Sequence, residues 1–258
     1  MKKCYIIALY KYTFDVGYCK LHKLTKSWLN LTNKSIRINT KRIINALGNW
    51  GKNQLKLNYL TTWNNVAANI ELDSVVNNVN LLINSVDFAF WNKNKIKKKD
   101  PQWSYKCNAP GRRYQILMDL ETRILKIWGG YSPKLYDGNW LEIHRDWLEK
   151  NLKRGVIAGD CAYSWGKKHL TNVTILIPYE KPKEKKRKRG NDDAGATELS
   201  KGQKLYNNAL RKTRSRVEHP FGQIKSQWAT LKGYFKEEPD KLDSLIYFVF
   251  GLYNRQLK

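Results

Sequence analysis

Apolar residues recur at helical spacing through the first eighty residues of the chain. Four of them share one face of a helix: Ile43, Ile44, Leu47 and Trp50. Thr32 and Ser35 are both candidate capping residues at the start of this helix. We therefore predict a helical region over residues 1–80. Two roles fit this pattern: a helix-turn-helix module that binds DNA, or a helical brace packed on the rest of the protein.

Short β-rich runs replace the helical pattern from about residue 80. Five runs are rich in β-branched and aromatic residues: 81–91, 113–120, 124–128, 156–161 and 173–179. Turn residues join the first three runs, so we expect an antiparallel meander. Residues 137–152 have one apolar helical face, and a helix at this point lets the fourth strand run parallel to the first. The pattern predicts an α/β fold with a five-stranded mixed sheet flanked by helices.

Two features mark the last third of the chain. Residues 181–200 form a basic, low-complexity stretch, which predicts a solvated, disordered loop. Helical spacing then returns in one apolar stripe: Leu210, Val217, Phe221, Ile224, Trp228 and Leu231. Pro220 should kink this helix just after Glu218, because proline forfeits one backbone hydrogen bond. We expect two parts, the helical region 1–80 and one domain over 81–258.

The charge balance points to a polyanionic partner. The chain has 48 Lys and Arg residues against 22 Asp and Glu residues, a formal net charge of +26. Each Lys or Arg docked on a nucleic-acid phosphate releases a counterion and adds affinity. A basic ribosomal or chromatin protein without chemistry fits the same charge. The apolar runs are shorter than the ~20 residues of a membrane span, so no membrane contact is expected.

Three acidic residues lie where an acid is unusual. Asp87 lies within an expected strand, where burial requires a compensating partner. Asp160 ends an expected central strand, which is where α/β sheets bind ligands. Glu218 lies near the apolar stripe of the last helix, so its carboxylate can face the sheet. Taken singly, each has a simpler explanation: a turn residue, a cap and a surface ion pair.

Together the three acids suggest metal-dependent chemistry. If the first and fourth strands are neighbours, Asp87, Asp160 and Glu218 converge at one edge of the sheet. Three carboxylates so close cannot all stay ionised without a cation. Two Mg²⁺ or Mn²⁺ ions about 3.5–4 Å apart would offset the repulsion and promote phosphodiester cleavage.

Several short motifs, spread in order over about residues 80–255, carry a family resemblance. They are Ser85-Val-Asp87, Trp103-Ser-Tyr-Lys106, Pro110-Gly-Arg-Arg-Tyr114, Gly159-Asp-Cys-Ala-Tyr163 and Val217-Glu-His-Pro-Phe-Gly222. With these motifs the sequence resembles the DDE endonuclease superfamily, in particular PIF/Harbinger-type transposases and related bacterial insertion-sequence transposases. The resemblance implies an RNase H-like core in which Asp87, Asp160 and Glu218 bind two metal ions and catalyse DNA strand cleavage and transfer. Asp137 matches another recurrent acid of the family and is assigned a supporting role.

The resemblance also implies partners and a location. The expected partner is double-stranded DNA, as transposon ends and target, bound by a homo-oligomer. Three basic residues near the third acid are expected to contact DNA phosphates: Arg214, His219 and Lys225. The basic run of Lys185, Lys186, Arg187, Lys188 and Arg189 is a candidate nuclear import signal, a phosphate-binding loop or a solvated charge run. The family favours nuclear delivery in a eukaryote; in a prokaryote the protein would lie in the cytoplasm or nucleoid.

Two departures from the family pattern motivate a second hypothesis. Phe88-Ala89 follows the first acid where relatives usually have Gly and Thr, and Cys161-Ala162 stands where relatives often have Lys and Gly. Both changes put bulk or apolar surface near the expected metal site. The alternative is therefore a domesticated or decayed transposase that binds DNA without catalysis. A ribonuclease or Holliday-junction enzyme on the same fold is a third, weaker hypothesis.

Overall fold

The computed structural model describes residues 2–29, 31–55, 68–72, 75–92, 96–181 and 198–257. Three helices come first: α1 (Lys2–Phe14), α2 (Tyr18–Leu29) and α3 (Asn33–Gln54). Thr32 caps α3, since its side chain accepts a hydrogen bond from the backbone N–H of Ser35 at 3.1 Å. The predicted N-terminal helical region is confirmed for these three helices, which end at Gln54. It is followed before residue 80 by an antiparallel hairpin that the sequence pattern did not predict, β1 (Ala68–Leu72) and β2 (Val75–Val79).

One mixed sheet forms the centre of the molecule. Its strands lie in the order β4 (Trp103–Ser104), β5 (Ala109–Asp119), β3 (Leu81–Ala89), β7 (Val156–Ala158) and β8 (Thr174–Leu176), and β6 (Ile124–Tyr131) also pairs with β5. Strands β3, β5 and β6 form the predicted antiparallel meander, and β7 runs parallel to β3. All five expected strands are present, and the two-residue β4 adds a sixth. The RNase H-like α/β fold is therefore confirmed.

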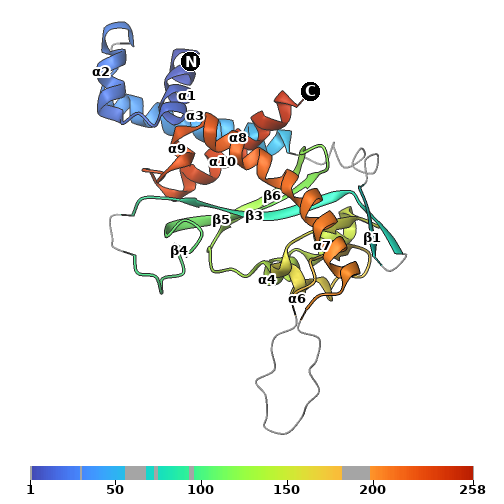
Figure 1. Ribbon diagram of the computed structural model, residues 1–258. Helices are drawn as coiled ribbons and strands as arrows, with labels where there is room; N and C mark the ends of the chain where they lie inside the picture. Colours follow the sequence, from blue (N-terminus) through green and yellow to red (C-terminus); the bar gives the residue numbers. More distant parts are fainter. Residues whose placement is uncertain are drawn as a thin grey trace.

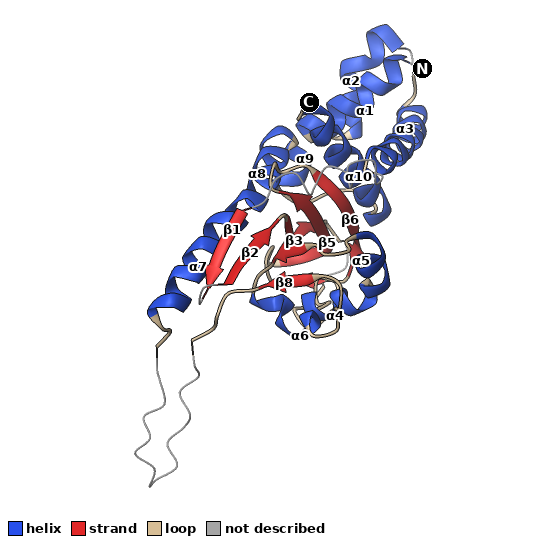
Figure 2. Cartoon of the chain, turned by 90° about the vertical axis from the view of Figure 1, so that its right-hand side faces the viewer, coloured by secondary structure: helices blue, strands red, loops and turns tan. Residues whose placement is uncertain are grey.

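Helices cover both faces of this sheet (Figures 1 and 2). One face carries α4 (Asp137–Ile143), α5 (Arg145–Asn151), the 3-10 turn η3 (Cys161–Tyr163) and α6 (Ser164–Lys167). The other carries α7 (Lys201–Arg214), the 3-10 turn η4 (Ser215–Val217), α8 (Glu218–Gln227), α9 (Ala229–Lys232) and α10 (Pro239–Gln256). Alternate residues of β3 divide between the two cores. Leu81 and Ile83 pack in the core under α4, whereas Leu82 and Val86 pack in the core under α8 and α10.

Two helix predictions differ from the structure. The single helix expected over 137–152 is broken at His144, whose φ of −107° and ψ of 11° leave the helical region. The expected kink after Glu218 is wrong, because the break comes before that residue, at η4. Pro220 lies in the first turn of α8, where the backbone N–H has no helical partner and its loss costs no hydrogen bond.

The N-terminal helices pack on the C-terminal ones (Figure 1). A Cβ on Gly48 would lie 2.8 Å from the Cα of Ser244, and one on Gly251 would lie 2.7 Å from the Cα of Gly51. The backbones of α3 and α10 therefore touch, and α3 acts as a brace on the core. The apolar run 245–253 is buried within α10, and within the described ranges no helix is both long and apolar enough to cross a bilayer.

Candidate active site

The central strand β3 carries polar residues on both of its faces. Ser85 and Asp87 lie on the face covered by α4, and Asn84 lies on the face covered by α8 and α10, because successive strand residues alternate. Leu82 and Val86, the residues two before and two after Asn84, belong to the apolar core under α8 and α10. Asn84 and Asp87 therefore lie on opposite faces of the sheet.

Asp87 is held in a buried ion pair. Its side chain is 0% exposed, and its two oxygens accept hydrogen bonds from Ser104 Oγ at 2.6 Å and from Arg113 Nε and Nη2 at 2.8 and 3.1 Å. Burial alone would lower the pKa of Arg113, but the hydrogen bonds and charge of Asp87 raise it above the usual value. Arg113 is thus the compensating partner that a buried aspartate requires, and both carboxylate oxygens are occupied.

Asp137, the expected supporting acid, belongs to the same buried network. It begins α4 and accepts hydrogen bonds from Gln115 Nε2 and from Ser85 Oγ, the latter at 3.2 Å, while its Oδ1 lies 3.7 Å from Arg113 Nη1. Tyr163 extends the network by donating a hydrogen bond to Gln115 Oε1 at 2.6 Å. Burial raises the pKa of Asp137, although the positive charge of Arg113 opposes the shift. The network ties β3, β5 and α4 to η3, the turn that follows β7.

Asp160 lies at the end of β7, as the sequence indicated. Its backbone is extended, with φ −90° and ψ 179°, and its Oδ1 caps η3 by accepting a hydrogen bond from the Ala162 N–H at 2.9 Å. Its Oδ2 lies 3.7 Å from Arg214 Nη2, and 34% of its side chain is exposed. The charge of Asp160 contributes to the raised pKa of Asp137, after the larger effect of burial. Asp160 therefore faces a cation from α7 while remaining accessible to solvent.

The last helices bring Glu218 and Lys225 over the other face of β3. Glu218 is an exposed residue in the first turn of α8, directly after η4, which contacts β3. Lys225 places its Nζ 5.4 Å from the ring centre of Phe88. His219 is exposed beside Glu218. Helix α8 therefore runs along β3, and Glu218 shares the face of the sheet on which Arg214 approaches the end of β7.

The structure places the three acids of the predicted metal site on two different faces of the sheet. Glu218 and Asp160 belong to the face covered by α7 and α8, whereas Asp87 points to the opposite face and binds Arg113. Across the described ranges no three His, Cys, Asp or Glu side chains form a group that could hold a metal ion. Asn84 is the first polar residue after the apolar run 81–83 of β3.

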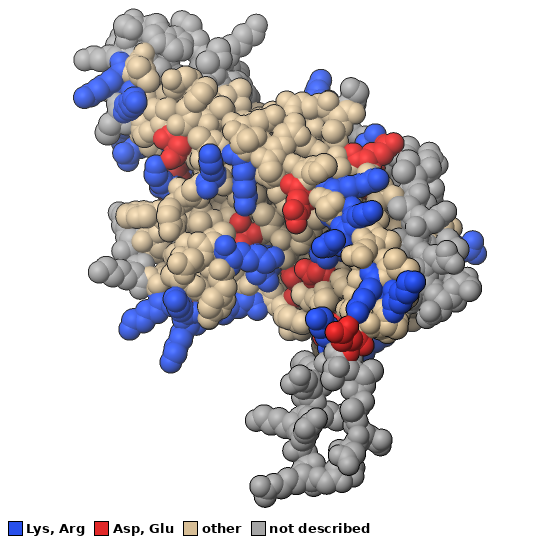
Figure 3. Space-filling model, in the orientation of Figure 1, with Lys and Arg blue, Asp and Glu red and all other residues tan. Residues whose placement is uncertain are grey.

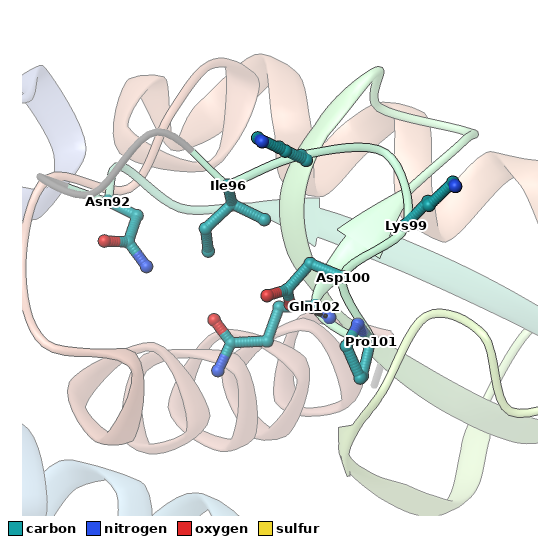
Figure 4. A pocket seen from close by; sticks show the side chains of 7 residues that line it. Asn92, Ile96, Lys99, Asp100, Pro101 and Gln102 are labelled. Carbon is teal, nitrogen blue, oxygen red and sulfur yellow. Dashed lines mark hydrogen bonds between the residues drawn. The ribbon is translucent and has the colours of Figure 1, made fainter.

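A surface hollow of about 810 Å³ beyond the end of β3 is separate from these acids. Figure 4 shows the residues that line it: Asn92, Ile96, Lys97, Lys99, Asp100, Pro101 and Gln102. Asp100 is the one acid among them, and its Oδ1 accepts a hydrogen bond from the backbone N–H of Gln102 at 2.8 Å. The hollow thus offers one carboxylate, already engaged, and we do not assign it to the candidate active site.

The fold and these residues define a class of protein: a nuclease-type α/β domain with one acid at the end of a central strand and another on a helix across the sheet. A sequence model of the DDE superfamily endonuclease family matches residues 85–254, about two thirds of the chain. The chain therefore belongs to this family, whose members generally use divalent metal ions, and the superfamily expected from the motifs is confirmed. No curated protein and no solved structure gives a significant match.

Proposed function

We propose that this chain is a DNA-binding protein of transposase origin that holds duplex DNA over α7, η4 and α8. The observation that carries the proposal is the charge of residues 201–227, which contain one acid, Glu218, and seven basic residues: Lys201, Lys204, Arg211, Lys212, Arg214, Arg216 and Lys225. On this side of the molecule Lys and Arg side chains surround the acidic ones (Figure 3). Such a surface binds phosphates through counterion release.

Arg214 is the residue best placed to hold a phosphate beside the acids. Its Nε is buried and has no hydrogen-bond partner within the described part of the chain, and its Nη2 is 3.7 Å from Asp160. A guanidinium presents several donors in one plane and binds phosphate oxygens in pairs. Arg211 and Lys225 lie on the same stripe of the helices, before and after Arg214. Together they form a track for one strand of the DNA backbone.

The second candidate function is metal-dependent cleavage and transfer of DNA strands, as family membership suggests. The presence of Asp160 and Glu218 on one face favours it. The predicted site would use two Mg²⁺ or Mn²⁺ ions held by these two acids and Asp87. Asp87 is instead neutralised by Arg113 on the opposite face, so the geometry supports DNA binding more strongly than cleavage.

We further propose a PIF/Harbinger-type ancestor, with transposon ends and target sites as the duplex partners and a homo-oligomer as the bound form. The motifs around Asp160 and Glu218 support this ancestry. Nuclear delivery by the basic run 185–189 is part of the same proposal. That run, and most of the predicted disordered loop, lies outside the described residues.

Duplex binding as a function of salt tests the proposal. The double variant Arg211→Gln/Lys225→Gln removes two charges from the track. Each lost phosphate contact should reduce the slope of log K against log salt by about 0.9 and weaken binding about tenfold at 0.1 M salt. The matched control, Lys150→Gln/Lys153→Gln, removes two exposed charges at the α5 side of the sheet and should change neither quantity by as much.

The measurement is fluorescence anisotropy of a labelled duplex titrated with the full chain at several salt concentrations. Equal slopes for the track variant and the control would overturn the placement of DNA on α7 and α8. Binding that does not depend on salt would overturn phosphate recognition altogether.

A further inference from the structure

The register between β3 and β7, continued past its last pair, places Asn84 beside Asp160. The parallel ladder pairs Leu82 of β3 with Ala158 of β7. One residue further, a Cβ on Gly159 would lie 3.4 Å from a side-chain carbon of β3, so the strands remain adjacent beyond their last paired residues. Two residues beyond the pair, the same register places Asn84 next to Asp160, at the roughly 4.8 Å spacing of neighbouring strands.

Asn84 and Asp160 also face the same side of the sheet. Leu82 and Ala158 both belong to the core under α8 and α10. Asn84 lies two residues after Leu82, and Asp160 lies two residues after Ala158, in extended backbone. Side chains two residues apart in an extended chain point to the same face. Asp87, three residues after Asn84, must point to the other face, as its pairing with Arg113 shows.

The positions of Arg214 and Lys225 indicate where Glu218 lies along β3. Arg214, just before η4, contacts the Asp160 end of the sheet, and Lys225 lies over Phe88. From Glu218 to Lys225 the helix advances about 10.5 Å. From Asn84 to Phe88 strand β3 advances about 13 Å. Since the helix and the strand run in the same direction over similar lengths, Glu218 stands close to the level of Asn84.

The charges at this place do not suit two divalent cations. Asn84 is a neutral amide, so the carboxylates are those of Asp160 and Glu218, and the guanidinium of Arg214 lies 3.7 Å from Asp160. Two carboxylates and one guanidinium carry a net charge of −1, against +4 for two Mg²⁺ ions. Affinity for hard cations is set by the number of charged oxygen ligands. The residues present therefore do not fit the two-ion centre that the family implies.

We propose that Asn84 occupies the position of a third metal-binding carboxylate, and that in this chain Arg214, instead of a pair of divalent cations, balances the acids. The site is thus a charge-compensated remnant that one substitution, Asn84→Asp, converts into a cation-binding site. This inference rests on the proposed function only for locating the site at Asp160 and Glu218. Its test measures cation binding in the absence of DNA, so a failure of this inference can be distinguished from a failure of the proposed DNA binding.

Titration of the full chain with Mn²⁺, followed by calorimetry and by the Mn²⁺ paramagnetic resonance signal, tests the proposal. Asn84→Asp should tighten the Mn²⁺ dissociation constant at least about tenfold over the unmodified chain, because it adds a charged oxygen ligand. Adding Glu218→Gln to this variant should remove the gain. The matched control Asn208→Asp adds the same charge at an exposed position of α7 and should leave Mn²⁺ binding unchanged.

A second variant tests the same idea without a change in the strand. Arg214→Gln removes the tethered cation, so it should also tighten Mn²⁺ binding, by less than Asn84→Asp does. Circular dichroism confirms that each variant is folded, and if Asn84→Asp unfolds, Arg214→Gln decides. The proposal is overturned if the folded variants bind Mn²⁺ no better than the unmodified chain. It is equally overturned if the unmodified chain binds two Mn²⁺ ions tightly and Asp87→Asn abolishes that binding.

Discussion

Replacing Asp87 with alanine should destabilise the fold rather than remove a metal ligand. The carboxylate is fully buried and accepts three hydrogen bonds, two of them from Arg113, whose own side chain is 12% exposed. Asp87→Ala leaves that guanidinium buried without a counter-charge. Breaking a buried ion pair on one side costs about 3–5 kcal/mol. For a protein of this size the cost corresponds to a fall in Tm of roughly 6–20 °C.

Two comparisons make this prediction specific to the ion pair. Asp160→Ala should cost less, about 1–2 kcal/mol, because its ion pair with Arg214 is 3.7 Å long and screened by solvent, so the loss is mainly that of the cap on η3. The double variant Asp87→Leu/Arg113→Met should be more stable than Asp87→Ala, because it leaves no unpaired charge in the core. The two comparisons separate loss of charge pairing from loss of packing.

Urea unfolding, followed by circular dichroism, measures these free energies. The reasoning is refuted if Asp87→Ala unfolds within about 1 kcal/mol of the unmodified chain, since experimental spread and small surface effects stay below that value. If Asp87→Ala left the stability unchanged but altered Mn²⁺ binding, Asp87 would be assigned as a metal ligand.

Two further predictions concern the contact between the N-terminal helices and the core. Glu237 is 9% exposed and lies 2.7 Å from Lys11 and 2.9 Å from Lys241; burial would raise its pKa, but the charges and hydrogen bonds of the two lysines lower it. The Glu237 carboxylate therefore contributes its full share to the free energy of unfolding above the ordinary glutamate pKa of about 4.3. This share is lost as the pH falls through the lower pKa that Glu237 has in the folded protein. Glu237→Gln should cost about 3–5 kcal/mol at neutral pH, with the deficit shrinking below pH ~4; a constant deficit in unfolding measured across that range would contradict the assignment. Gly51→Ala would place a Cβ against the carbonyl oxygen of Tyr247. Thermal unfolding should therefore show a free energy of unfolding lower by about 1–3 kcal/mol. An unchanged Tm would contradict the close packing of α3 on α10.

Much of the fold follows from local pattern. The five β-rich runs became strands because their apolar residues are β-branched or aromatic and turn residues separate them. The helical stretch between the third and fourth runs allowed a crossover, and the parallel pairing of β7 with β3 that this predicted is observed. The hairpin at 68–79 and the break at His144 did not follow. The hairpin contacts α7 and β7, and His144 hydrogen-bonds Tyr131 of β6 at 2.7 Å, so both features involve segments that the local pattern does not show.

For the candidate site, the sequence by itself determined the family, the basic character of α7 and α8, and the positions of Asp160 and Glu218 at the end of a strand and the start of a helix. Only the tertiary structure decided which face of the sheet each polar residue of β3 takes. Side chains in a strand alternate with a period of two, so the three-residue step from Asn84 to Asp87 changes the face. Which face meets Asp160 depends on the register between β3 and β7, and packing of segments some seventy residues apart sets that register.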